Sequence, residues 1–115
     1  MSDLSDLAKR FIEFRDARDW KKFHNPKDVA VALTVEAAEV LELFQWHSPE
    51  DTEAFLAKNR EQLEDELADV LHNLLLLSYD LNIDLITACR RKLEQNEKKY
   101  PVDKARGRAN KYTNL

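Results

Sequence analysis

Residues 35–69 read VEAAEVLELFQWHSPEDTEAFLAKNREQLEDELAD, and they predict two helices that carry acidic side chains toward each other. The stretch holds two acidic pairs, Glu36/Glu39 and Glu66/Asp69, each spaced i, i+3. Residues three apart share a helix face, so each pair aims two carboxylates at one point. One break between the pairs, QWHSP, lets the second helix return against the first. We therefore expect four carboxylates to meet in one cleft.

A close cluster of carboxylates repels itself unless protons or cations neutralise it. Oxygen ligands of this kind suit Mg²⁺, and protein-bound Mg²⁺ usually also binds substrate phosphates. The pattern favours a Mg²⁺-dependent enzyme that acts on a phosphorylated small molecule. The alternative is a solvated face, because 35% of the chain is charged and such spacings also arise by chance. Against it, Glu36 interrupts an apolar stripe and Glu66 flanks another, which is costly for a carboxylate that is neither paired nor metal-bound.

The composition indicates one domain of long helices. The 115 residues include one Gly and three Pro, too few for many tight turns. A net charge of −4 disfavours a nucleic-acid polymer as partner, but not a nucleotide that brings its own Mg²⁺. No apolar run approaches the ~20 residues that cross a bilayer, so we expect no membrane partner. The polar N-terminus is unlike a signal peptide, and a single cysteine, Cys89, allows no intrachain disulfide, so we expect a soluble, cytoplasmic protein. Cys89 lies in an apolar helical pattern, so we expect it to be a small buried thiol.

No segment alternates at period two for long enough to predict a strand, so the fold class is all-α, an antiparallel four-helix bundle. The predicted helices cover about residues 3–18, 26–46, 61–81 and 85–99, with a short helix or frayed turn over residues 50–60. The expected N-caps are Ser2 or Asp3, Asn25 (before Pro26), Ser48 and Asp84. About residues 101–115 form a basic tail, whose plainer interpretation is disorder.

Two further stretches bear on assembly and binding. Residues 74–77 are four leucines, apolar all round the predicted helix, and a helix apolar on every face is buried on every face. We therefore expect a partner subunit to cover them. The connector after the first helix carries Trp20, Phe23 and His24 between charges, as many binding loops do. The alternative is that its aromatic rings plug the end of the bundle.

Five segments, in order, resemble one enzyme family. They are Glu-x-x-Glu followed after residues 40–65 by Glu-x-x-Asp, Arg18-Asp19-Trp20-x-x-Phe23-His24-x-Pro26, Glu42-Leu43-Phe44-Gln45-Trp46, Lys92-x-x-x-Asn96-x-x-x-Tyr100-Pro101 and Lys111-Tyr112-Thr113. Together they resemble the MazG-like, all-α nucleoside triphosphate pyrophosphohydrolases, in their dCTP pyrophosphatase branch. The resemblance extends from about Phe11 to Leu115, which makes the whole chain, residues 1–115, one MazG-like domain.

The resemblance implies hydrolysis of a (deoxy)nucleoside triphosphate to the monophosphate and pyrophosphate with Mg²⁺, for which Mn²⁺ can substitute. It also implies that Glu36, Glu39, Glu66 and Asp69 ligate the metal. Glu36 or Glu39 could instead take the proton of the attacking water. The implied substrate-binding residues are Trp20, His24 and Trp46 around the base, Lys92, Asn96 and Tyr100 near the phosphates and sugar, and Asn73.

Three positions depart from the family pattern. Val35 stands where many members carry a second Glu, which bears on the number of Mg²⁺ ions. Phe11 stands where some dCTP-selective members place a base-contacting histidine, and Asn73 where some place tyrosine. We therefore expect preference without exclusivity, with dCTP or a modified dCTP best and turnover of another dNTP such as dATP.

The resemblance further implies a role in cleaning the nucleotide pool. It also implies a homo-oligomer, a tetramer built as a dimer of dimers, with a dimer as the alternative. The competing hypothesis is a non-enzymatic helical module whose acidic cleft binds a metal or a partner structurally.

Overall fold

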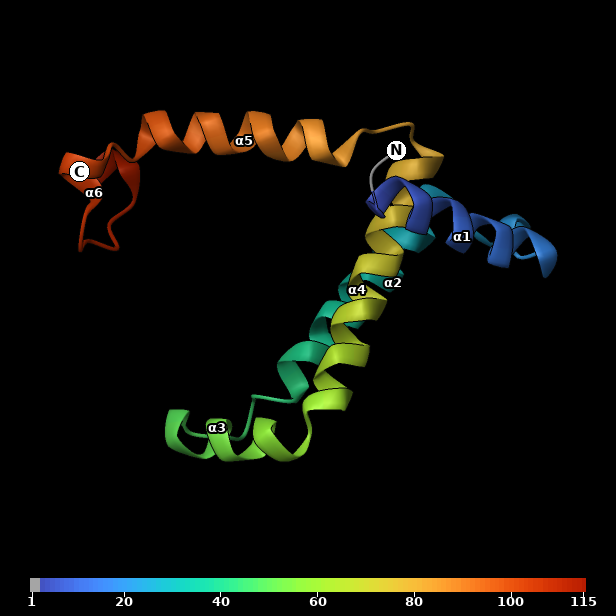
Figure 1. Cartoon of the computed structure of the whole chain (residues 1–115), viewed down its shortest axis with the longest axis horizontal. Coiled ribbons are helices and arrows are strands. Elements are labelled where there is room, and N and C mark those ends of the chain that lie inside the picture. The colour runs from blue at the N-terminus through green and yellow to red at the C-terminus, as the bar shows by residue number, and fades with distance from the viewer. Residues whose placement is uncertain (1–2) are drawn as a thin grey trace. The chain divides into compact units, whose positions relative to one another are not determined.

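The computed structural model describes residues 3–115, which form helices joined by turns and short links (Figure 1). The elements are α1 (Asp3–Ala17), η1 (Lys21–Phe23), α2 (Pro26–Glu42), α3 (Pro49–Lys58), α4 (Arg60–Asp80), α5 (Leu85–Lys99), α6 (Val102–Ala105) and η2 (Tyr112–Asn114). Residues 3–115 contain no strand, which confirms the all-α class. None of these helices is long and apolar enough to cross a membrane. The chain divides after Asn82 into two compact units, described separately below.

Local sequence determines where three of the helices begin. At each start a short polar side chain accepts a hydrogen bond from a backbone N–H three residues on. These pairs are Asn25 with Asp28 (2.9 Å), Ser48 with Asp51 (3.2 Å) and Asp84 with Thr87 (3.1 Å). The three predicted caps are therefore confirmed. Of the remaining candidates, Asp3 is the first residue of α1, and Ser2 lies outside the described residues.

The core of the first unit is the contact between α1, α2 and α4. Ile12, Val29 and Leu76 form a buried cluster, one residue from each helix, with Phe11 and Leu77 packed against it. α2 and α4 lie side by side (Figure 1). They run antiparallel, because the start of α2 meets the end of α4 in this cluster. The middle of α2 therefore faces the first half of α4, where the acidic motifs lie.

The structure corrects the end of the second helix. α2 ends at Glu42, four residues before the predicted end at Trp46. Beyond it i−3 backbone bonds appear beside an i−4 bond: Phe44 N–H donates to the Leu41 carbonyl at 2.9 Å and His47 N–H to the Phe44 carbonyl at 3.0 Å, while Gln45 N–H donates to the Leu41 carbonyl at 2.9 Å. Trp46 therefore lies in a turn past the helix and not on it. The following segment, residues 49–58, is a regular helix and not a frayed turn.

The leucine run is partly buried within the first unit. Leu75 and Leu76 are only 4% and 3% exposed, and Leu74 and Leu77 are half-buried. α1 and α2 pack around the end of α4 and bury Leu75 and Leu76, so these two need no partner subunit, and a partner that covers Leu74 and Leu77 stays a prediction.

In the second unit the tail is structured, so the interpretation as a disordered tail is wrong. The Tyr112 ring packs edge-on against Tyr100 with centroids 6.0 Å apart, and Lys99 Nζ lies 4.9 Å from the Tyr112 ring centroid.

α5 keeps its predicted bounds. Cys89 is exposed, contrary to the prediction of a buried thiol, because the tail packs about three turns away along α5. The four-helix bundle and the single domain stay predictions, since α5 belongs to this second unit.

Candidate metal centre and substrate pocket

Three acidic side chains converge between α2 and α4. Glu36 and Glu39 from α2 and Glu66 from α4 each offer one carboxylate oxygen, and these oxygens lie within 4.8 Å of one another. The i, i+3 spacing puts the two α2 residues on one face, and the antiparallel pairing brings α4 opposite them. We call these three residues the acidic triad. The fourth predicted ligand, Asp69, lies outside the triad, one turn further along α4, and lines a pocket together with Glu36.

The carboxylates of the triad are crowded together, and the pKa values of two of them are raised. Glu36 Oε2 and Glu66 Oε2 are buried and accept no hydrogen bond within the described residues. Burial, followed by the neighbouring Glu39 carboxyl, raises the pKa of Glu36. Hydrogen bonding with Glu39, followed by burial, raises the pKa of Glu66. Crowded carboxylates with two buried oxygens that accept no hydrogen bond fit a divalent cation, which would neutralise their charge and occupy those lone pairs.

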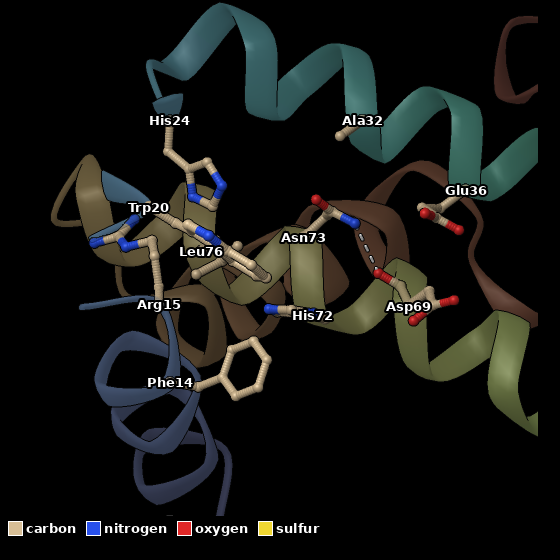
Figure 2. Close-up of a pocket in the computed structure, with 10 residues that line it drawn as sticks. All are labelled: Phe14, Arg15, Trp20, His24, Ala32, Glu36, Asp69, His72, Asn73 and Leu76. Atoms are coloured by element: carbon tan, nitrogen blue, oxygen red, sulfur yellow. Dashed lines mark hydrogen bonds between the residues drawn. The ribbon is translucent and has the colours of Figure 1, made fainter. Parts of the chain in front are cut away.

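A pocket of about 210 Å³ opens beside the triad, within the first unit (Figure 2). Its acidic end is formed by Glu36 and Asp69, and Ala32 leaves room between the helices. The other lining residues are Phe14, Arg15, Trp20, His24, His72, Asn73 and Leu76. The pocket thus joins a carboxylate end to an end rich in rings.

Three predicted substrate-binding residues line this pocket: Trp20, His24 and Asn73. His24 Nδ1 is buried without a hydrogen-bond partner in the described part of the chain. Asn73 Nδ2 donates to the Asp69 carbonyl at 3.0 Å, which fixes the orientation of the amide (Figure 2). Only the amide nitrogen can donate to a carbonyl, so the amide oxygen remains available as an acceptor.

The aromatic residues of the connector do not plug the unit. Trp20 and Phe23 are 43% and 64% exposed, so the plug interpretation is wrong. Trp20 packs edge-on against Phe14 with ring centroids 5.7 Å apart, and the Arg18 guanidinium lies 3.7 Å from the centroid of the same Phe14 ring. This packing holds the indole at the rim of the pocket.

The sequence analysis missed a buried ion pair at the ring-rich end. The Arg15 side chain is 2% exposed and donates to both carboxylate oxygens of Asp80, at 2.7 and 3.1 Å. Burial alone would raise the pKa of Asp80, but hydrogen bonds and charge from Arg15 lower it overall. The Arg15 carbonyl also accepts from Trp20 N–H at 3.1 Å, so the pair ties the Trp20 connector to α4. Asp80 lies two heptads after Glu66 on the flank of the same apolar stripe, and this position could have marked Asp80 in the sequence as a partly buried carboxylate.

The sequence analysis also missed His72. Its ring stacks on Phe11, with centroids 4.0 Å apart and planes 16° apart. Burial is the main cause that lowers the pKa of His72, with a smaller contribution from the charge of His24, against the opposing effect of Asp69. The position of His72 inside an apolar helical run could have marked it as a candidate site residue. Its stacking partner, Phe11, lies 61 residues away in the sequence and could not be predicted.

One predicted site residue of the first unit lies outside this pocket, and three belong to the second unit. Trp46 is 84% exposed and does not line it. Lys92, Asn96 and Tyr100 are exposed side chains of the second unit, so their roles stay predictions.

Comparisons with known proteins agree with one another. The model of the MazG-like family matches residues 31–115. The dCTP pyrophosphatase 1 of Mus musculus is 42% identical over 116 residues, which cover 97% of this chain and 67% of that protein. The Homo sapiens protein of the same name is 36% identical over 114 residues, covering 97% of this chain and 67% of its own length. The crystal structure of a pyrophosphatase from Archaeoglobus fulgidus matches with a TM-score of 0.83 and 42% identity, over 88% of this chain and 94% of that chain.

Proposed function

This chain belongs to the MazG-like family and is a nucleoside triphosphate pyrophosphohydrolase, and we propose that it converts deoxynucleoside triphosphates to monophosphates and pyrophosphate with Mg²⁺. The observation that carries the proposal is the acidic triad beside a pocket, in which Glu36 of the triad and Asp69 form one end and aromatic rings form the other. Such a pocket offers a place for the phosphates and a place for the base. A purely structural acidic cleft would have no use for the aromatic end.

The residues that would hold the metal are the triad, with Asp69 adjacent to it. The unpaired buried oxygens of Glu36 and Glu66 are hard donors, the type that Mg²⁺ prefers and that Mn²⁺ also accepts. When bound, Mg²⁺ supplies charge neutralisation to the triphosphate and acidity to water. Either Glu36 or Glu39, whichever carboxylate keeps a free oxygen, takes the proton of the water that attacks the α-phosphorus.

The ring-rich end would receive the base. The Trp20 indole gives a stacking surface that tolerates any base, while His24 supplies hydrogen bonding. We propose a preference for dCTP or a modified dCTP, with dATP as a second substrate. Lys92, Asn96 and Tyr100 would contact the phosphates and the sugar.

We also propose that the protein acts as a homo-oligomer, a tetramer built as a dimer of dimers. Its support is apolar surface on the α2 and α4 pair: Val31, Val35, Leu41 and Leu67 are each at least half exposed. A second subunit would cover this surface and would be the source of Trp46 for the base site. Cleaning of the cytoplasmic nucleotide pool is the role that this activity would serve.

The test is turnover of a panel of dNTPs with Mg²⁺. We expect one pyrophosphate and one dNMP per dNTP consumed, with dCTP at the top of the panel. Release of orthophosphate alone, or no turnover of any nucleotide, would overturn the proposal. The same panel with EDTA should show no turnover.

A further inference from the structure

His72 is a polar side chain in the pocket for which the proposed chemistry has no role. It lies on α4 and lines the pocket between the acidic end and the aromatic end (Figure 2). Its ring nitrogens form no hydrogen bond with any residue from 3 to 115. A polar group turned into a pocket without a protein partner is available to a ligand.

The stack of Phe11 on His72 fixes the orientation of the imidazole ring. The Phe11 ring covers one face of His72 in a near-parallel stack, and Phe11 itself packs against the core residues Ile12, Val29 and Leu76. Because the core holds Phe11, the plane of the His72 ring is set before any ligand arrives. An oriented group keeps more of its interaction energy on binding than a flexible one.

The position of His72 along α4 suits a base and not a phosphate. It follows Glu66 by six residues, which is about 9 Å along the helix axis. Trp20 and Phe14 line the same part of the pocket. Triphosphate oxygens at the triad would therefore place the sugar between the triad and His72.

We propose that His72 contacts the nucleobase and helps to determine which dNTP is preferred, and that Phe11 is the residue that positions it. This inference rests on the proposed function, because it needs a nucleotide in the pocket. A neutral imidazole has one donor and one acceptor nitrogen, so it can read the hydrogen-bonding edge of a base. The stacking surface of Trp20 cannot supply that discrimination.

The first test compares steady-state kinetics of His72→Phe with the wild type. Phenylalanine keeps the flat ring and the stack on Phe11 but removes both nitrogens. We expect KM for the best dNTP to rise about tenfold, the contribution of one hydrogen bond, with little change in kcat. The discrimination between the best and the worst dNTP should fall by a similar factor.

The matched control is Tyr79→Phe, which removes a polar group from an exposed position on the same helix, outside the pocket lining. It should leave KM unchanged. A second pair of variants tests the positioning role. Phe11→Leu should raise KM as His72→Phe does, whereas Phe11→Tyr, which keeps the flat ring, should leave KM at the wild-type value. A thermal melt of each variant identifies any that is not folded.

The second test needs no turnover and observes the imidazole directly by NMR. The probes are Mg²⁺ with α,β-imido-dCTP and Mg²⁺ with inorganic tripolyphosphate, which lacks a base. The His72 ring signals, assigned by their loss in His72→Phe, should shift with the nucleotide and not with tripolyphosphate.

Three results would overturn the inference while the wild type still hydrolyses dNTPs. They are an unchanged KM for every dNTP in His72→Phe, a lowered kcat with unchanged KM, and His72 signals that do not respond to the nucleotide. An unchanged KM in Phe11→Leu would overturn the positioning role alone. Absence of dNTP turnover in the wild type would instead remove the proposed function, and the inference with it.

Discussion

Arg15 and Asp80 form a two-bond ion pair, at 2.7 and 3.1 Å, that fastens the end of α1 to the end of α4. The Arg15 side chain is almost fully buried and the Asp80 side chain is 11% exposed. Removing Asp80 would leave the buried Arg15 charge with only the more exposed Asp16 carboxylate, 3.6 Å from Arg15 Nε, as its counter-charge. The pair also bounds the ring-rich end of the substrate pocket, since Arg15 lines it.

Asp80→Ala should therefore lower the free energy of unfolding by about 3–5 kcal/mol, measured by urea denaturation at neutral pH. Arg15→Met combined with Asp80→Leu should recover most of that loss, because no charge is then left buried. The control is Glu64→Ala, which breaks the exposed Arg60–Glu64 pair and should cost about 0.5 kcal/mol or less. Equal losses for the two single variants would contradict the buried-pair account.

Glu39→Gln should keep the fold but abolish turnover, because it removes charge from the triad while nearly preserving shape. Without metal it should also raise the melting temperature, since a like-charge repulsion disappears. Glu42→Gln is the matched control: it lies one turn further along α2, is exposed and lies outside the triad. Wild-type turnover of Glu39→Gln at saturating Mg²⁺ would exclude Glu39 as a ligand.

The stability of the metal-free protein should depend on pH above the ordinary glutamate pKa of 4.5. The pKa values of Glu36 and Glu66 are raised in the folded state. Above pH 4.5 the folded protein therefore holds protons that the unfolded chain has released, and the free energy of unfolding falls as pH rises through the raised values. Urea unfolding in EDTA, from about pH 5 to about pH 8, should record this decline, and Glu39→Gln should reduce it. A flat wild-type profile would contradict the raised values.

The titration of Asp80 changes the free energy of unfolding in the opposite direction, and in a lower pH range than that of Glu36 and Glu66. Its pKa is lowered from the ordinary 3.8, so its contribution to stability is present above that value and is lost as pH falls through the lowered pKa. The Asp80→Leu and Arg15→Met double variant should therefore lose less stability than the wild type on acidification below about pH 4.

Trp20→Ala should raise KM by about tenfold to a hundredfold for every dNTP, the ~1–3 kcal/mol of lost base stacking, with a much smaller effect on kcat. The control is Phe23→Ala in the same connector, since Phe23 is 64% exposed and does not line the pocket. If KM is unchanged in Trp20→Ala for every dNTP tested, the base binds elsewhere.

Light scattering at micromolar concentration should give the mass of a tetramer. Deletion of residues 104–115 should then weaken substrate binding without dissociating the assembly, if the tail closes a neighbouring active site. A monomer mass for the full chain would refute the oligomer and with it the role of Trp46 in a partner's pocket.

The local features of this fold could be predicted from the sequence. The caps at Asn25, Ser48 and Asp84 depend on residues three positions apart, and so do the faces that carry Glu36 and Glu39. The antiparallel return of α4 followed from one break in the pattern. Together these were enough to predict the acidic triad, though not that Asp69 lies outside it.

The features that the sequence did not predict depend on distant partners or on small changes of backbone geometry. Arg15 and Asp80 lie 65 residues apart, and nothing near either residue indicates the other. The stack of Phe11 on His72 is of the same kind. The early end of α2 coincides with the appearance of i−3 hydrogen bonds, which leaves the apolar pattern unchanged.

The placement of Glu36, Glu39 and Glu66 on two rigid, antiparallel helices has a consequence for insertions and deletions. One residue added to α2 between Val29 and Glu36 would turn both α2 carboxylates by about 100° around the helix axis, away from Glu66. A change of length within residues 43–59 has no such effect, because those residues link the two helices without setting the rotation of either. Natural or engineered length variation should therefore be tolerated around α3 and rejected within the helices that carry the triad.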